Sequence, residues 1–129
     1  MLGLFGIFGR ASSLKALDQA LREFGVNPRT VPEAAKLAAV RFMQKGPNAA
    51  SKLRGANYVG AGELLGYAIL GPDQFVASNS VDAANSAKLR LEAAIAAGDG
   101  LDADLILLAL HSGIMHAGIA DLFDIESSE

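Results

Sequence analysis

Two histidines near the C-terminal end of the sequence could act as metal ligands or carry protons. His111 and His116 are five positions apart, so on one helix their side chains would point about 140° apart, which disfavours a shared metal ion. Asp104 and Met115 fall on the same helical face as His111, and a bend at Gly113 would be needed to bring the histidines together. We therefore expect no metal site. The simpler prediction places His111 in the last turn of a helix and His116 near a short helix start or a loop.

A serine beside a histidine suggests nucleophilic catalysis, but the spacing of Ser112 and His111 does not favour it. Adjacent helical residues diverge by about 100°, so their side chains do not face each other. The sequence also lacks the G-x-S-x-G context of a nucleophile elbow, and the glycines from Gly55 to Gly62 do not form a phosphate-binding loop. We expect no catalytic residue and no cofactor.

Glu63 and Tyr67 are four positions apart and would share one face of a helix. Together with His111 and His116 they could line a pocket, which gives one alternative function, a small-molecule-binding protein or an enzyme. The more common arrangement is a solvated glutamate beside a half-buried tyrosine. A convergence of His111 with carboxylates around a cavity would favour the pocket.

The elements that must position these residues are predicted to be helical. The 129 residues fit one domain, 1–129, and 51% of them are hydrophobic, mostly the strong helix formers Ala and Leu. Cysteine is absent, which excludes disulfides and cysteine zinc sites and fits a reducing, cytoplasmic location. No strand-like alternation persists. The sequence predicts an all-α, single-domain bundle of five to six mostly antiparallel helices with short loops containing Gly or Pro.

Capping residues and Gly or Pro stops give the expected helix boundaries. The first helix is expected to begin at Ser12 or Ser13, and the second to open with a capping box formed by Thr30 and Glu33. Asp102 is expected to cap the helix that is apolar nearly all round, which is predicted to be the core helix. The expected helices span residues 12–24, 30–45, 50 or 56 to 70, 79–97, 102–112 and 117–123, with one further turn at 73–78 and an acidic tail at 124–129.

Three glycines inside one predicted helix need a reason, because each costs about 1 kcal/mol relative to alanine. They are Gly60, Gly62 and Gly66. Gly62 and Gly66 lie one turn apart, so we expect them to allow a neighbouring helix to approach closely.

The charges are sorted by position along the chain. Residues 1–54 carry a balance of +6, residues 55–98 carry −2, and residues 99–129 carry −7 with no Lys or Arg. We expect the acidic end to lie near the basic residues of the first two helices, in the same chain or in a partner subunit. Nucleic acid is not an expected partner, because the basic stretch lacks interleaved aromatic residues and the protein is acidic overall.

The first ten residues form an apolar N-terminal arm, 1–10, which ends with the base Arg10 and is followed by Lys15. Such an arm could fold onto its own bundle, cross into a partner subunit, or insert shallowly into a membrane surface. Its five large apolar residues are Leu2, Leu4, Phe5, Ile7 and Phe8.

These observations favour a non-catalytic protein-interaction module that self-associates into a homo-oligomer, through the arm or through a helix face. A peripheral membrane protein that uses the arm is a further alternative. The arm is a poor signal peptide, because it is short and has no basic residues before its apolar part. The longest stretch without charged residues near the C-terminal end, 105–120, is too short to span a bilayer. No particular protein partner is identified by the sequence.

Overall fold

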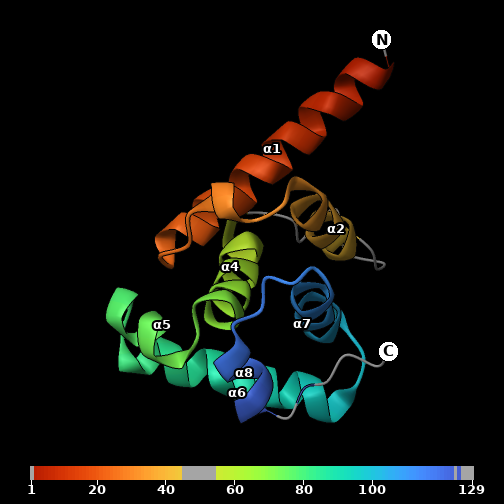
Figure 1. The fold of residues 1–129 in the computed structure, drawn as a ribbon. Coiled ribbons are helices and arrows are strands. Elements are labelled where there is room, and N and C mark those ends of the chain that lie inside the picture. Colours follow the sequence, from red (N-terminus) through yellow and green to blue (C-terminus); the bar gives the residue numbers. More distant parts are fainter. Residues whose placement is uncertain (1, 45–54, 124, 126–129) are drawn as a thin grey trace.

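The computed structural model describes the backbone of residues 2–44, 55–123 and 125, and side chains from residue 13 onward within these ranges, except at 44 and 55–57. The fold is all-α: this part of the chain contains seven α-helices, one 3₁₀ helix and no strand (Figure 1). The elements are α1 (Leu2–Glu23), η1 (Pro28–Thr30), α2 (Glu33–Gln44), α4 (Gly55–Leu70), α5 (Pro72–Ser78), α6 (Val81–Ala97), α7 (Leu101–His111) and α8 (Ala117–Leu122). The number exceeds the expected five to six because the segment expected to form one further turn at 73–78 is a complete helix, α5.

Several helix ends follow from their capping residues. The Ser80 hydroxyl accepts a hydrogen bond from the backbone N–H of Ala83 at 3.0 Å and so caps α6. Gly98 ends the same helix in the left-handed conformation, with φ of 75°, which glycine adopts without steric cost. Pro72 occupies the first turn of α5, where its missing N–H breaks no helical hydrogen bond.

The expected start of the first helix is wrong. Helix α1 begins at Leu2 and runs without interruption past Ser12 and Ser13, so the backbone of the arm is the first part of α1. A serine can cap a helix but can also lie inside one, and the residues that follow Ser12 and Ser13 are compatible with both positions. The side chains of the five apolar residues of the arm lie outside the described part of the chain, as do residue 124 and residues 126–129 of the acidic tail.

Two expected capping arrangements are also wrong. Thr30 belongs to η1, where its hydroxyl donates to the carbonyl oxygen of Asn27 at 2.7 Å, and α2 begins at Glu33. Gly100, rather than Asp102, is the N-cap residue of α7. The carboxylate of Asp102 instead binds an arginine of the neighbouring helix α6.

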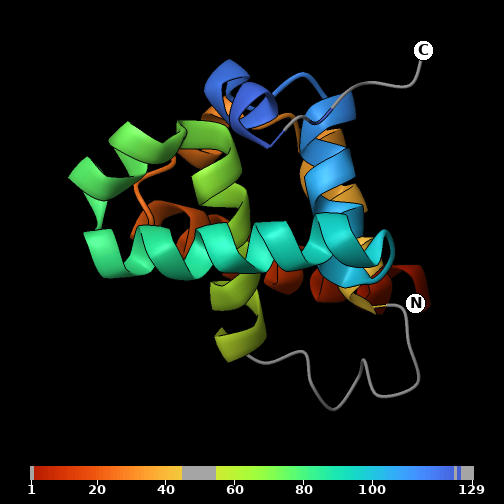
Figure 2. The same ribbon diagram turned by 90° about the horizontal axis from the view of Figure 1, so that it is seen from below.

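Helix α4 lies at the centre of the fold and contacts α1, α5, α6 and α7. Figure 2 shows α6 crossing α4 and α7 rather than running alongside them, so the expectation of mostly antiparallel helices does not describe these pairs. The buried apolar side chains form one cluster that draws on all the helices from α1 to α8. The predicted core helix, α7, is more peripheral than expected, since Leu101 is 41% and Leu107 is 44% exposed.

The contact between α1 and α4 is closest at Gly62. A Cβ atom built on Gly62 would lie 2.7 Å from the Cβ of Ala20 and 2.8 Å from its backbone carbon. Backbone atoms cannot move aside as a flexible side chain can, so this crossing requires glycine. Gly66 is less restricted, because its Cβ would lie 3.2 Å from the Cβ of Phe24.

The length and hydrophobicity of the helices bear on the membrane alternative. Within the ranges that the structure describes, none of the helices has the length and apolar character needed to cross a bilayer.

Candidate functional site

Tyr67, one of the predicted pocket residues, is part of an aromatic cluster in the core. Its ring meets that of Phe75 edge-to-face at 5.5 Å between centroids and that of Phe123 at 6.4 Å, while Phe24 stacks on Phe75 at 6.0 Å. The four rings therefore join α1, α4, α5 and the end of α8. Burial raises the pKa of the Tyr67 phenol above its ordinary value, and the negative charge of Glu92 raises it further. A neutral, buried phenol of this kind stabilises the fold and is poorly suited to proton transfer near neutral pH.

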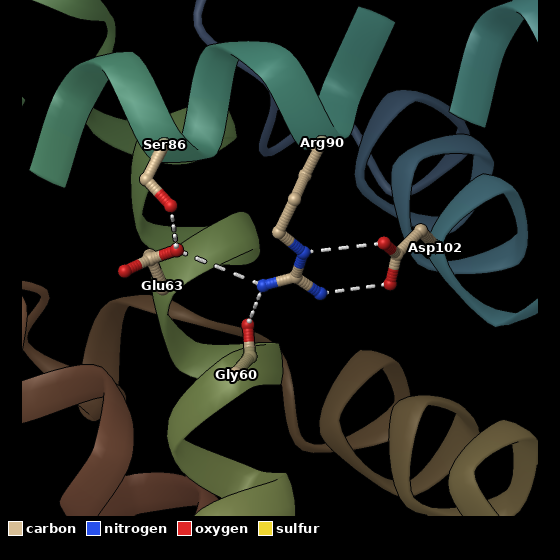
Figure 3. A network of polar contacts seen from close by, with 5 residues as sticks. All are labelled: Gly60, Glu63, Ser86, Arg90 and Asp102. Carbon is tan, nitrogen blue, oxygen red and sulfur yellow. Dashed lines mark hydrogen bonds and ion pairs between the residues drawn. The ribbon is translucent and has the colours of Figure 1, made fainter. Parts of the chain in front are cut away.

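Glu63 takes part in a polar network centred on Arg90 of α6 (Figure 3). The Arg90 guanidinium binds both carboxylate oxygens of Asp102, through Nη2 at 2.8 Å and Nε at 3.2 Å. Its Nη1 donates to the carbonyl oxygen of Gly60 at 2.7 Å and lies 3.8 Å from Oε1 of Glu63. The hydroxyl of Ser86 donates to the same Glu63 oxygen at 3.4 Å.

This network joins three helices through one side chain. The bidentate pair between Arg90 and Asp102 fixes α6 relative to α7, and the contacts with Gly60 and Glu63 fix α6 relative to α4. Both carboxylates are held as acceptors for the guanidinium of Arg90. We interpret the network as a structural connection between the helices.

The two histidines lie at helix ends, as the sequence predicts. His111 is the exposed last residue of α7, and His116 is the N-cap residue of α8. The Nδ1 atom of His116 accepts a hydrogen bond from the N–H of Gly118 at 2.9 Å. Its backbone N–H donates to the carbonyl oxygen of Ala68 at 2.8 Å, and its ring packs against Gly71. His116 thus holds α8 against the end of α4, a role that requires no ligand.

The described side chains give little support for catalysis. Within the described ranges, no three His, Asp or Glu side chains gather as metal ligands would. Ser112 is the C-cap residue of α7, and its N–H donates to the carbonyl oxygen of Leu108 at 2.9 Å. The buried hydroxyl of Tyr58 has no hydrogen-bond partner among the described atoms.

An apolar hollow lies between α6 and α7, on a part of the surface that the sequence analysis did not identify. Its volume is about 220 Å³, below the range of roughly 300–1,000 Å³ that small-molecule sites usually occupy. None of Glu63, Tyr67, His111 and His116 lines it. The lining residues are Ala94, Ile95, Gly98, Ala103, Ile106, Leu107 and Ile125.

Several of the lining residues have acidic neighbours in the chain. Asp99 is exposed and follows Gly98 directly in the chain, Asp104 precedes Leu107 by one helical turn, and the exposed Glu92 precedes Ile95 by one turn. Lys88 is two turns before Ile95, about 10 Å along the helix. A ligand for this surface would therefore combine apolar groups with positive charge. The sequence did not predict the hollow, because the exposure of Leu107 depends on how α6 crosses α7.

The described ion pairs do not follow the expected attraction between the acidic and basic ends of the chain. Lys36 of α2 binds Asp18 of α1 at 3.0 Å, so this lysine takes its partner from within residues 1–54 and not from the acidic end. Asp102, from the acidic region, takes its partner Arg90 from the middle of the sequence. Among the described residues, no ion pair joins the acidic region to a basic residue of α1 or α2.

Comparison with known protein families, with curated proteins and with solved structures gives no match for this chain. The function must therefore be argued from the geometry alone.

Proposed function

We propose that this protein is a non-catalytic interaction module that self-associates through the N-terminal part of α1. The observation that carries the proposal is the position of this segment. Figure 1 shows the first turns of α1 extending away from the helices that pack on its C-terminal half. In the C-terminal half of α1, Leu17, Ala20 and Leu21 are buried against the core.

The composition of the segment supports a protein partner. Five of the seven residues from Leu2 to Phe8 are large and apolar, and full burial of each such side chain contributes about 1.5–3 kcal/mol. A helix that extends beyond its own core can gain this free energy only from another surface. A second copy is always present at the protein's own concentration, which favours self-association over a rarer partner.

Two alternative functions are less well supported than self-association. A membrane surface would also bury an apolar helix followed by Arg10 and Lys15. A small-molecule site near Glu63 and Tyr67 is less well supported, because the carboxylate contacts Arg90 and the phenol is buried among aromatic rings.

Sedimentation velocity of the whole chain across a concentration series tests the proposal. We expect a reversible rise in mass with concentration, and we expect the double variant Phe5→Ser, Phe8→Ser to remain monomeric while keeping its helical circular dichroism. A chain that is monomeric at every concentration would exclude self-association. Binding of the chain, but not of the double variant, to anionic liposomes would then favour the membrane alternative.

A further inference from the structure

We propose that the hollow between α6 and α7 is the docking site for the N-terminal part of α1 from a second copy of this chain. This inference rests on the proposed self-association and names the surface that receives the helix. The hollow and the helix segment are matched in size, in polarity and in charge.

The size of the hollow suits one aromatic side chain. An apolar cavity of about 150 Å³ is enough to bind benzene, so the hollow of about 220 Å³ can accept one phenyl ring. Its walls are formed by aliphatic side chains, of which Ile95 is 43% and Leu107 is 44% exposed. The segment offers Phe5 and Phe8, which by helical spacing lie on neighbouring positions of one face.

The charges around the hollow and along the segment are opposite. In the chain, Asp99 follows the lining residue Gly98, and Asp104 follows the lining residue Ala103. Residues 2–17 of α1 contain Arg10 and Lys15 and no acid. Lys15 follows Phe8 by seven positions and is therefore on the same face of the helix, with an exposed side chain. Attraction between these groups would orient the incoming helix and speed its association.

The occupant must come from another chain. In Figure 1 the N-terminal end of α1 and helix α6 lie at opposite ends of the molecule. Helix α1 is continuous from Leu2 to Glu23, so its first turns cannot fold back across the core to reach the hollow. The contact is therefore heterologous, with a different surface on each partner, and it can repeat head-to-tail. We expect masses beyond the dimer as the concentration rises.

Matched substitutions on α6 and α7 test the surface. Leu107→Ser removes an apolar wall of the hollow, whereas Leu89→Ser changes an exposed leucine on α6 that does not line it; Leu89 is 66% exposed. We expect Leu107→Ser to weaken association at least about tenfold, as loss of a central interface side chain does. The Leu89→Ser control is expected to associate like the parent, and both variants are expected to melt within a few degrees of it.

A charge exchange tests the orientation of the helix. Lys15→Glu and Asp99→Lys are each expected to weaken association several-fold, and the chain that carries both changes is expected to regain part of the loss. A purely apolar contact would show no such recovery. Increasing salt is expected to weaken the parent assembly and to have less effect on the single-charge variants.

Cross-linking gives a direct geometric test, because the natural chain has no cysteine. A Gly9→Cys chain is mixed under mild oxidation with a size-tagged Ala97→Cys chain, and in a parallel control with a size-tagged Asn85→Cys chain. Ala97 lies beside the hollow at the end of α6 and Asn85 lies near its start. We expect a mixed disulfide dimer with Ala97→Cys in clear excess over the control.

The outcomes separate the two proposals. If the Phe5→Ser, Phe8→Ser variant loses assembly but Leu107→Ser does not, and the two cysteine pairs cross-link equally, the docking site is wrong while self-association stands. If the parent chain never associates, both proposals fall. The docking site is supported if Leu107→Ser loses assembly while Leu89→Ser keeps it, and if Gly9→Cys cross-links to Ala97→Cys in excess over Asn85→Cys.

Discussion

Two helix contacts in this molecule, α1 with α4 and α6 with α7, differ in how tightly their residues pack. Where α1 crosses α4, Gly62 brings the helices so near that a single added carbon would meet the backbone of Ala20 at 2.8 Å. Where α6 crosses α7, alanines and a glycine line the contact but leave a hollow of about 220 Å³ bordered by exposed aliphatic side chains. Small residues thus produce close packing in one place and an open surface in the other.

The difference arises from what lies around each contact. The crossing of α1 and α4 is next to the aromatic cluster of Phe24, Tyr67 and Phe75, which fills the space beside it. The crossing of α6 and α7 is held on one side by the bidentate contact of Arg90 with Asp102, and the described residues leave a hollow on it. We infer that the first contact supplies stability and that the second is available for binding.

The largest loss is expected from the aromatic cluster. Phe75 is fully buried, stacks on Phe24 and meets Tyr67 edge-to-face. Phe75→Ala is expected to lower the free energy of unfolding by about 3–5 kcal/mol, because it leaves a cavity where three elements meet. Urea denaturation followed by circular dichroism measures this loss. A change below 1 kcal/mol would mean that the cluster contributes little to stability.

The glycine contact gives the next largest effect. Gly62→Ala is expected to destabilise the protein by about 1–3 kcal/mol, because its new methyl group overlaps the backbone of Ala20. Gly60→Ala on the same helix is the matched control: its Cβ would meet only Nη1 of Arg90, at 3.7 Å. That control is expected to stabilise α4 by up to about 1 kcal/mol through helix propensity. Equal effects at the two positions would contradict a close contact at Gly62.

Much of the helical organisation could be predicted from the sequence because it depends on neighbouring residues. Ser80, Gly98 and the Gly71-Pro72 pair mark helix ends through local hydrogen bonding and backbone geometry, and the structure follows them. The start of α1 at Leu2 was missed because an inner serine resembles a cap. Crossing directions were also missed, since α6 and α4 meet through residues that are far apart in the chain.

The candidate surface could be predicted less well than the fold. Tyr67 and Glu63 share a helix, as the sequence indicates. The sequence does not indicate that Phe75 and Phe123 pack around Tyr67, or that Arg90 binds Glu63. The hollow depends on three separate segments, one of which contributes only Ile125. The leucines of α7 predicted burial, but Leu101 and Leu107 are exposed.

Substitutions of Arg90 are expected to lower the free energy of unfolding by a moderate amount. Arg90→Gln is expected to cost about 1 kcal/mol, since the guanidinium is about one-third exposed and water replaces part of what is lost. Arg90→Lys keeps the charge but cannot bind both Asp102 oxygens, so it is expected to recover only part of the loss. Thermal unfolding at low and high salt measures both. A larger loss in Arg90→Lys than in Arg90→Gln would contradict the assigned geometry.

The smallest effect is expected at the hollow, and it sharpens the contrast between stability and binding. Leu107→Ala is expected to change the free energy of unfolding by no more than about 0.5 kcal/mol, because the side chain is already 44% exposed. Leu105, two positions earlier on the same helix, is fully buried, and Leu105→Ala is expected to cost about 2–5 kcal/mol. Denaturation at a concentration where the protein is monomeric compares the pair. A large loss in Leu107→Ala under those conditions would place Leu107 in the folding core, and the hollow would then have to be regarded as a packing defect of the monomer and not as a surface for a second chain.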